Sequence, residues 1–292
     1  MLTGTYTAIV TPFRRGQVDF TRFRELIRRQ VQAGVDGIVP VGTTGESPTV
    51  NYEEHIQIIG HAVEYAAGKI KVMAGTGGNS TSEAVYLTQE AAKAGADSSL
   101  QVAPYYNKPT QDGLFRHFLE ISRASKLPLV LYSVPSRCGV EIGVETVRRL
   151  AAATPRVVGI KESGGNPERV TQLRAALGKR FTILSGDDGM TLPFMAVGAH
   201  GVISVLSNVA PRAVARMVRA YREGDHATAL KLHDDYYPLV KALFIESNPG
   251  PVKAALGMMG LIDEECRLPL APMSAKNRET LRAALEQLGL IK

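Results

Sequence analysis

The chain has 292 residues, of which 45% are hydrophobic and 21% charged, and this accommodates one large α/β domain. Its 34 Lys and Arg are scattered among 28 Asp and Glu, so the sequence contains no dense basic run that would bind nucleic acid. The net charge of +6 favours the binding of small anionic molecules. Two distant cysteines, Cys138 and Cys266, exclude a disulfide framework. Without an apolar leader or a run approaching about 18 apolar residues, we expect a cytoplasmic protein and no membrane partner.

Eight β-rich segments are each followed by a segment with apolar residues at helical spacing. The expected strands are 5–11, 37–41, 71–74, 98–103, 129–132, 157–160, 182–184 and 201–204. The expected helices are 19–33, 53–67, 82–94, 114–125, 144–153, 168–177, 190–197 and 213–222. Alternating strands and helices require parallel pairing with right-handed crossovers, and eight units predict a (β/α)8 TIM barrel.

Helix start signals support these boundaries. Capping sequences are Ser80 with Glu83, Asn51 with Glu54, and Asn166 before Pro167.

The pattern changes after residue 224. Segments 226–244, 251–259 and 275–288 are helical in period, with no strand between them. We therefore predict two domains, a barrel with the active site over 1–224 and an all-helical domain over 225–292. We expect the second to pack against the barrel or against another subunit.

The apolar strand 156–160 leads directly to Lys161, which places an amine at the carboxyl end of a barrel strand. Catalytic groups collect at this end of a barrel. Partial burial would disfavour the ammonium form and make Lys161 a candidate Schiff-base nucleophile. The alternatives are a lysine that reaches solvent along its stem or that pairs with Glu162.

Other strand ends carry polar groups. The turn 42–47 holds Thr43 and Thr44 between glycines, so its N–H groups and hydroxyls either bind an anion or only cap the turn. Tyr105, Tyr106 and Tyr132 either relay protons or pack.

Three further loops complete the strand ends. Arg137, in a Pro- and Gly-bounded loop, either binds a carboxylate or is solvated. The sequence Gly186-Asp187-Asp188 favours a structural loop and helix cap over a metal or phosphate site. The small residues of 201–204, at the end of the eighth strand, leave space for a ligand beside Lys161. No His or Cys spacing, Walker A or G-x-G-x-x-G pattern indicates a metal or nucleotide cofactor.

Together these motifs resemble the dihydrodipicolinate synthase family of pyruvate-dependent class I aldolases, a superfamily that also contains N-acetylneuraminate lyase. The resemblance covers essentially the whole chain. It rests on 42–47 (GTTGES), 104–109 (PYYNKP), Tyr132 with 134–137 (VPSR), 159–162 (GIKE) and 185–188 (SGDD).

The resemblance implies that pyruvate forms an imine with Lys161 and then attacks L-aspartate-4-semialdehyde, giving 4-hydroxy-tetrahydrodipicolinate in the diaminopimelate route to lysine. No cofactor is needed beyond this covalent imine. The implied roles are proton transfer by Tyr132 and a relay in which Thr43 links Tyr132 to Tyr106 of a neighbouring subunit. Thr44 and the backbone around Ile203 would bind pyruvate, and Arg137 would bind the carboxylate of the semialdehyde. Gly186 would be a further substrate-binding residue.

The resemblance also implies a homotetramer, built as a dimer of dimers, and feedback inhibition by L-lysine at a dimer interface. The matching positions are Ser47, His55, Asn79, Glu83 and Tyr105. Pro48, Tyr52, Ser133 and Cys138 depart from residues common in the family.

Three alternatives stay open at this point. A retro-aldol lyase of the same superfamily, of the N-acetylneuraminate or sugar-acid type, would keep Lys161 and Tyr132 but has no use for Arg137. An isomerase barrel that binds phosphate would form no pyruvate imine. A nucleic-acid-binding barrel would need salt-sensitive binding, which the dispersed charges do not favour.

Overall fold

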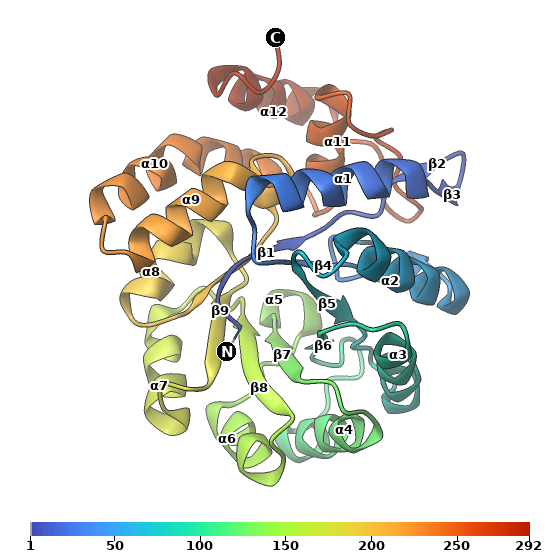
Figure 1. Cartoon of the computed structure of the whole chain (residues 1–292), viewed down its shortest axis with the longest axis vertical. Helices are drawn as coiled ribbons and strands as arrows, with labels where there is room; N and C mark the ends of the chain where they lie inside the picture. The colour runs from blue at the N-terminus through green and yellow to red at the C-terminus, as the bar shows by residue number, and fades with distance from the viewer. Residues whose placement is uncertain (1) are drawn as a thin grey trace.

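The computed structural model describes residues 2–292, and its centre is a closed barrel of parallel strands (Figure 1). The strands close in the order β1-β10-β9-β8-β7-β6-β5-β4. Their bounds are β1 Gly4–Ala8, β4 Gly37–Val39, β5 Lys71–Gly75, β6 Ser98–Val102, β7 Leu129–Ser133, β8 Val157–Glu162, β9 Thr182–Ser185 and β10 Gly201–Ser204. The predicted TIM barrel is confirmed.

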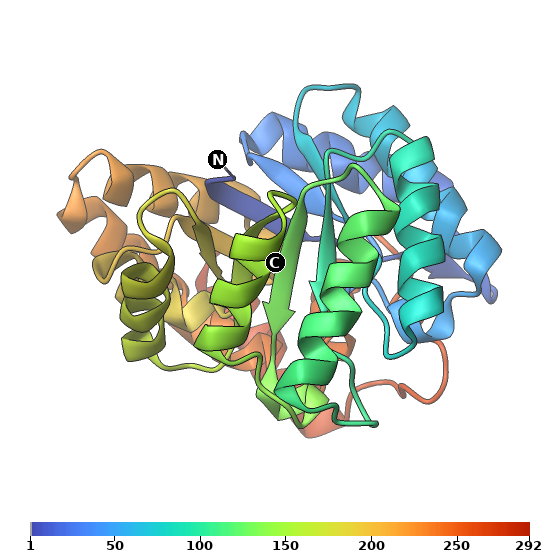
Figure 2. The same ribbon diagram turned by 90° about the horizontal axis from the view of Figure 1, so that it is seen from below.

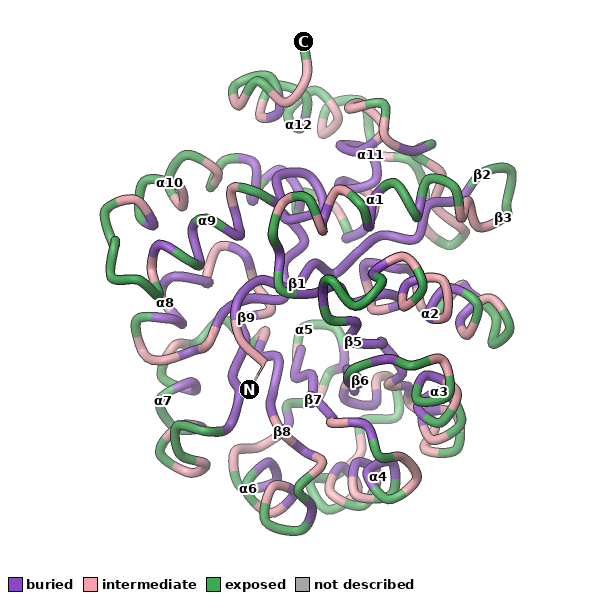
Figure 3. The backbone as a smooth tube through the Cα atoms, in the orientation of Figure 1, coloured by how far each residue is buried: buried purple, intermediate pink, exposed green. Residues whose placement is uncertain are grey.

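Helices surround the barrel, as the sequence period predicts (Figures 1 and 2). They are α1 Phe20–Ala33, α2 Tyr52–Ala66, α3 Thr81–Lys93, α4 Gln111–Ala124, α6 Val144–Ala153, α7 Pro167–Leu177, α8 Thr191–Ala196 and α9 Pro211–Arg222. Helix α1 illustrates why these segments pack as helices on the barrel. Its residues Phe23, Leu26 and Ile27 fall on one face and are buried. Figure 3 shows the same division around the ring, with buried backbone toward the barrel and exposed backbone outward.

Two of the three expected helix caps form. Asn51 and Glu54 make a complete capping box, and the Asn166 side chain accepts from the backbone N–H of Glu168, with proline at the first helical position. The Ser80 box is wrong, because the Ser80 side chain makes no capping bond and its Oγ lies 3.0 Å from Oγ of Ser82. A nearby hydroxyl replaces the backbone N–H as its partner.

Several short elements lie where the sequence predicted only loops. They are the hairpin of β2 (Phe13–Arg14) and β3 (Gln17–Val18), the helix α5 (Pro135–Cys138), and the 3-10 turns η1 (Ser47–Thr49), η2 (Asp188–Met190) and η3 (Leu206–Asn208). Elements of two to four residues are shorter than the period that reveals a strand or a helix.

Three helices follow the barrel: α10 His226–Leu243, α11 Gly250–Met258 and α12 Ala275–Gln287 (Figure 1). One cluster of buried apolar side chains runs through α1, α9 and these helices, including Ile27, Val214, Leu239 and Leu281. Packing against the barrel, one of the two expected roles, is therefore observed, while the domain boundary at 224 stays a prediction.

Within residues 2–292, no helix has the length and apolar character needed to cross a membrane.

Candidate active site

Lys161 and Tyr132 meet at the carboxyl end of the barrel. Strands β7 and β8 pair in a register that places Tyr132 opposite Lys161. Directly opposed residues on neighbouring strands point to the same face, so both side chains enter the barrel. Lys161 is 6% exposed, and its Nζ lies 4.1 Å from the centre of the Tyr132 ring. The alternative in which Lys161 reaches solvent is therefore wrong.

Glu162, the next residue, points to the opposite face of β8 and pairs elsewhere. Its Oε2 accepts from Arg169 Nε at 2.6 Å, and its Oε1 accepts from the backbone N–H of Gly164 at 2.8 Å. Burial raises the pKa of this carboxyl, and the Arg169 charge acts against that shift. Among the described residues Lys161 makes no ion pair, so the expected alternative of a Lys161–Glu162 pair is also wrong.

Lys161 opens into a cavity of about 240 Å³. The cavity is lined by Thr43, Thr44, Tyr132, Val134, Ser136, Arg137, Lys161, Ser163, Gly186, Asp187, Val205, Phe244 and Asn248. Gly186 leaves space beside the lysine, because a Cβ there would lie 2.8 Å from Lys161 Cε and 1.9 Å from Ser163 Oγ, so that these side chains would have to move. The predicted residues Thr43, Thr44, Arg137 and Gly186 thus share one cavity with Lys161 and Tyr132.

The turn after β4 is held tightly in place. Gly45 lies against the chain, since a Cβ there would be 2.8 Å from the backbone nitrogen of Val41. Thr44 is buried, and its Oγ1 accepts a hydrogen bond from Nδ2 of Asn248 at 2.9 Å. Glu46 adopts a left-handed φ of 57° and is also buried. The turn therefore presents its threonines from a fixed backbone.

Asn248 and Phe244 are site residues that the sequence did not reveal. Both come from the connection between α10 and α11 and line the cavity beside Lys161. The connection contains the sequence Asn248-Pro249-Gly250, a helix break that marks a loop but gives no hint of where it lies. The C-terminal helices thus contribute to the site as well as to packing.

Asp187 and Asp188 form a structural loop, as the sequence favoured. The Asp187 side chain accepts from the backbone N–H of Gly189 at 2.9 Å. Asp188 is buried and accepts from the Ser204 hydroxyl at 2.5 Å and from the backbone N–H groups of Val205 and Leu206. Within residues 2–292, no group of three His, Cys, Asp or Glu side chains could hold a metal ion.

A second cavity of about 200 Å³ adjoins the first and shares Thr43, Tyr132, Val134 and Arg137 with it. Tyr105 and Cys138 line it as well, and burial raises the pKa of the Cys138 thiol to about 11. Arg137 lies at the mouth of both cavities, with Nη2 3.4 Å from the backbone oxygen of Asn248. The guanidinium is thereby placed to meet an anion that enters.

Two predicted site residues do not join these cavities within one chain. Tyr106 is 90% exposed, has a φ of 71° and lines neither cavity. Ile203 is fully buried in β10, and it is Val205, two residues later, that reaches the cavity wall.

A third cavity of about 390 Å³ gathers four of the five residues predicted to bind lysine, namely Ser47, His55, Glu83 and Tyr105. The fifth, Asn79, donates from Nδ2 to the backbone oxygen of Tyr105 at 3.3 Å.

Two residues of this cavity have shifted pKa values. His55 is buried, with Nε2 2.7 Å from the backbone oxygen of Gly75, and burial lowers the pKa of its ring to about 4. Burial and then the Glu83 charge raise the pKa of Tyr105. Pro48 and Tyr52 complete the wall.

The comparisons with known proteins agree over the full length. A model described as the dihydrodipicolinate synthetase family matches residues 1–288. A 4-hydroxy-tetrahydrodipicolinate synthase from Bradyrhizobium diazoefficiens is 48% identical over 288 residues, covering 99% of this chain and 97% of that protein. The solved structure of the synthase from Methylacidiphilum fumariolicum SolV is 53% identical, with a TM-score of 0.98 and coverage of 99% and 96%.

Two further solved structures contain ligands. A chloride-inhibited dihydrodipicolinate synthase from Acinetobacter baumannii, complexed with pyruvate, is 44% identical with a TM-score of 0.97 and full coverage of both chains. A dihydrodipicolinate synthase from Cyanidioschyzon merolae with lysine bound is 39% identical with a TM-score of 0.96, covering 99% of each chain.

Proposed function

The chain belongs to the dihydrodipicolinate synthetase family and is a lyase of lysine biosynthesis with 4-hydroxy-tetrahydrodipicolinate synthase activity, and on this premise we propose that Lys161 is its Schiff-base nucleophile. One observation carries the assignment. Lys161 is a buried amine that opens into a cavity and makes no ion pair among the described residues. An amine that no carboxylate holds in place is free to approach and attack a carbonyl carbon in the cavity.

In the proposed sequence, Nζ of Lys161 attacks the keto carbon of pyruvate, and loss of water leaves an imine. The positive imine nitrogen accepts electrons when the methyl group loses a proton, which gives an enamine. The enamine carbon then bonds to the aldehyde carbon of L-aspartate-4-semialdehyde. Tyr132 is the proposed group that moves these protons, because it lines the same cavity and the centre of its ring lies 4.1 Å from Nζ.

The relay beyond Tyr132 would run through Thr43 and a tyrosine of another subunit. Thr43 and Tyr132 share both cavities, whereas Tyr106 projects into solvent from its own chain. An exposed aromatic side chain on a strained backbone is suited to entering a neighbouring site. We therefore propose a homotetramer in which Tyr106 completes the site of a partner.

Substrate binding is assigned to the remaining residues of the Lys161 cavity. Thr44 and the backbone near Ile203 would hold pyruvate, Gly186 leaves the space that the imine needs, and Arg137 would bind the carboxylate of the semialdehyde. An arginine at the mouth of the cavity suits this anionic partner better than the polyhydroxylated chain of a sugar acid. This preference agrees with the synthase names of the relatives.

We also propose that L-lysine inhibits by binding in the third cavity. Glu83 would attract the ammonium groups of lysine, and Ser47 and Tyr105 line both this cavity and the second cavity, which adjoins the one that holds Lys161. A ligand that orders these two residues could thereby alter the catalytic cavity. Feedback is tested by adding L-lysine to the wild type and to Glu83→Ala, which should lose the inhibition.

A cytoplasmic location, supported by the free thiols of Cys138 and Cys266, is tested by cell fractionation.

The imine is tested by intact-protein mass after addition of pyruvate and borohydride, which reduces an imine to a stable amine. We expect one adduct on the wild type, none on Lys161→Ala, and one on the matched control Lys69→Ala, since Lys69 is a surface lysine. An adduct that persists in Lys161→Ala would overturn the assignment.

A further inference from the structure

The turn that carries the two threonines, residues 42–45 after β4, has a strained residue at each end. Val41 and Glu46 adopt left-handed φ angles of 49° and 57°, a region that residues other than glycine enter at a cost in energy. In this conformation the backbone N–H of Glu46 donates to the backbone oxygen of Thr43 at 3.1 Å. Since Thr43 lines both the first and the second cavity, its position there depends on the conformation of Glu46.

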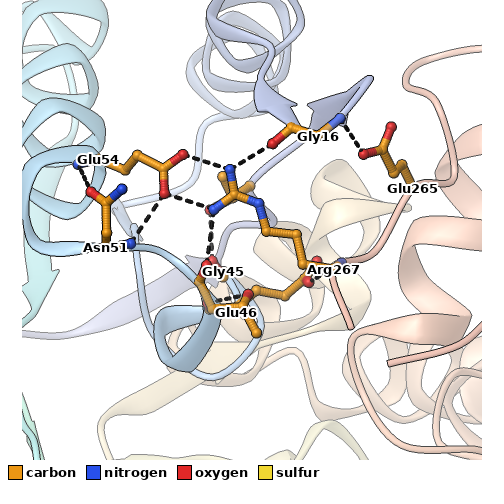
Figure 4. Close-up of polar contacts among 9 residues, drawn as sticks. Gly16, Gly45, Glu46, Asn51, Glu54, Glu265 and Arg267 are labelled. Atoms are coloured by element: carbon orange, nitrogen blue, oxygen red, sulfur yellow. Dashed lines mark hydrogen bonds and ion pairs between the residues drawn. The ribbon is translucent and has the colours of Figure 1, made fainter. Parts of the chain in front are cut away.

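The C-terminal part of the chain supplies the contacts that hold Glu46. The Glu46 side chain is buried, and its Oε1 accepts from Nζ of Lys253 at 2.5 Å. Its Oε2 accepts from the backbone N–H of Arg267 at 3.0 Å (Figure 4). These donors lie 207 and 221 positions away in the sequence. A strained conformation persists only where its surroundings hold it, and at Glu46 both carboxylate oxygens are held.

The guanidinium of Arg267 fixes this contact in place. Nη2 donates to Oε1 of Glu54 at 2.5 Å and to the backbone oxygen of Gly16 at 2.7 Å (Figure 4). Nη1 donates to Oε2 of Glu54 at 2.7 Å and to the backbone oxygen of Thr49 at 2.9 Å. One residue, Arg267, therefore binds the segment 46–54 at its start, in its middle and at its end.

Arginine is the residue type that these contacts require. Its planar group presents five N–H donors in a fixed fork, so it can bind a carboxylate through two bonds and still reach two backbone oxygens. The Arg267 side chain is 18% exposed, and its Cζ lies 4.3 Å from the centre of the buried Phe13 ring. The bonds of Arg267 are thus largely shielded from water, which strengthens them relative to those of a surface arginine.

We propose that Arg267 is a positioning residue for the reaction: by binding the segment 46–54 it holds Glu46 in its left-handed conformation and thereby keeps Thr43 aligned with Tyr132 for proton transfer. Arg267 lines neither the first nor the second cavity, so it acts through Glu46 and not on a substrate. A small misplacement of a group in a reacting chain lowers the rate strongly. The proposal rests on the proposed relay through Thr43 and Tyr132.

The relay is measured without the second substrate by following the exchange of pyruvate methyl protons in deuterated water by NMR. At the imine, a C–H bond breaks, its electron pair moves toward the imine nitrogen, and the proton passes to Tyr132. A deuteron returns by the same route and forms a C–D bond. Borohydride trapping counts the imine-forming sites in the same sample. The exchange rate per trapped site therefore reports on the relay and is independent of how much of the protein is folded.

Arg267→Met should lower the exchange rate per trapped site about tenfold and lower kcat equally, while the amount of pyruvate adduct stays at the wild-type level. Arg267→Lys keeps the charge but not the fork, and it should lower the rate about threefold. Arg278→Met breaks a comparable pair with Glu264 inside the C-terminal part and is the matched control, with an expected change below about twofold. If Arg267→Met yields less adduct but keeps the wild-type rate per trapped site, Arg267 is only structural and the proposal is overturned.

A double-mutant cycle with Glu54→Gln tests whether the bonds of Arg267 carry the effect. Glu54→Gln alone should lower the rate per trapped site about threefold, and the double variant with Arg267→Met should match Arg267→Met alone, because Glu54 acts through Arg267. Effects that multiply to about thirtyfold in the double variant would contradict the proposal.

Thermal unfolding of each variant shows that folded protein is compared, and Arg267→Lys carries the test if Arg267→Met does not fold. The wild type separates this proposal from the one on which it rests. If the wild type traps no pyruvate, or traps it without methyl exchange, the proposed function fails and this proposal fails with it. If the wild type does both and the Arg267 variants match its rate per trapped site, only the Arg267 proposal fails.

Discussion

Two buried lysines of this chain lie over aromatic rings but differ in their surroundings. Lys161 Nζ is 4.1 Å from the centre of the Tyr132 ring, and Lys253 Nζ is 4.2 Å from that of Phe13. Lys253 pairs with Glu46 and is sealed from solvent, whereas Lys161 opens into a cavity and has no ion-pair partner among the described residues. Burial lowers the pKa of Lys253, and the Glu46 charge opposes that shift.

Neither burial nor an aromatic neighbour separates these two lysines, because both have them. The carboxylate partner and the open cavity distinguish the two. Removing one partner of a buried ion pair leaves the other charge uncompensated, whereas an unpaired amine beside a cavity is available to a carbonyl substrate. The following predictions test this division.

Replacing Lys161 with methionine should have the largest effect on activity and a small effect on stability. We expect kcat/KM to fall by at least about 10⁴-fold, because the covalent route is lost. The free energy of unfolding should stay within about 1 kcal/mol of the wild type, since no ion pair is broken. Steady-state kinetics and urea denaturation measure the two quantities, and a large loss of stability would show that Lys161 is also structural.

Replacing Lys253 with methionine should show the reverse. The variant leaves the buried Glu46 carboxylate without its cation, so we expect unfolding to become easier by about 3–5 kcal/mol. The double variant Glu46→Gln/Lys253→Met removes both charges and should regain part of this loss. Urea denaturation of the three proteins provides the measurement. A single variant as stable as the wild type would refute a structural role for the pair.

Tyr132→Phe makes the ring beside Lys161 resemble the one beside Lys253. The aromatic contact is kept and the hydroxyl is removed, so kcat should fall by about 10²–10⁴-fold. Stability should change little, and borohydride should still trap pyruvate on Lys161, although more slowly. Full activity in this variant would exclude Tyr132 from proton transfer.

The smallest effect concerns two buried histidine rings that, unlike Lys253, have no charged partner among residues 2–292. Burial lowers the pKa of both His55 and His117 to about 4, below the ordinary value of 6.5. Between these values the unfolded chain binds protons that the folded chain excludes, so stability falls as the pH decreases from 6.5 toward 4. Each ring should contribute about 2 kcal/mol of loss by pH 5.

Denaturation of the wild type at pH 7 and pH 5 tests this prediction, with His117→Asn reducing the difference by about one ring's share. A loss of stability that is the same in the wild type and in His117→Asn would exclude that ring as a contributor.

The sequence by itself determined the features that depend on neighbours along the chain. Short β-rich segments and apolar residues at period 3.6 predicted the strands and helices of the barrel, and the continuous apolar run 157–160 placed Lys161 at a strand end. The cap formed by Asp187 was likewise expected, because a loop before a helix favours such a side chain. The bonds of Asp188 to Ser204, Val205 and Leu206 join distant parts of the chain and were not expected. The family motifs added which loops would share a site.

Only the tertiary structure decided which lysine is paired and which is free. The bonds from Lys253 to Glu46 and from Asn248 to Thr44 join residues 207 and 204 positions apart. Glu162 stands next to Lys161 in the sequence, yet the alternation of side chains along β8 turns it to Arg169. Such partners depend on how the barrel closes and where the C-terminal helices pack, and no local pattern of residues encodes that distance.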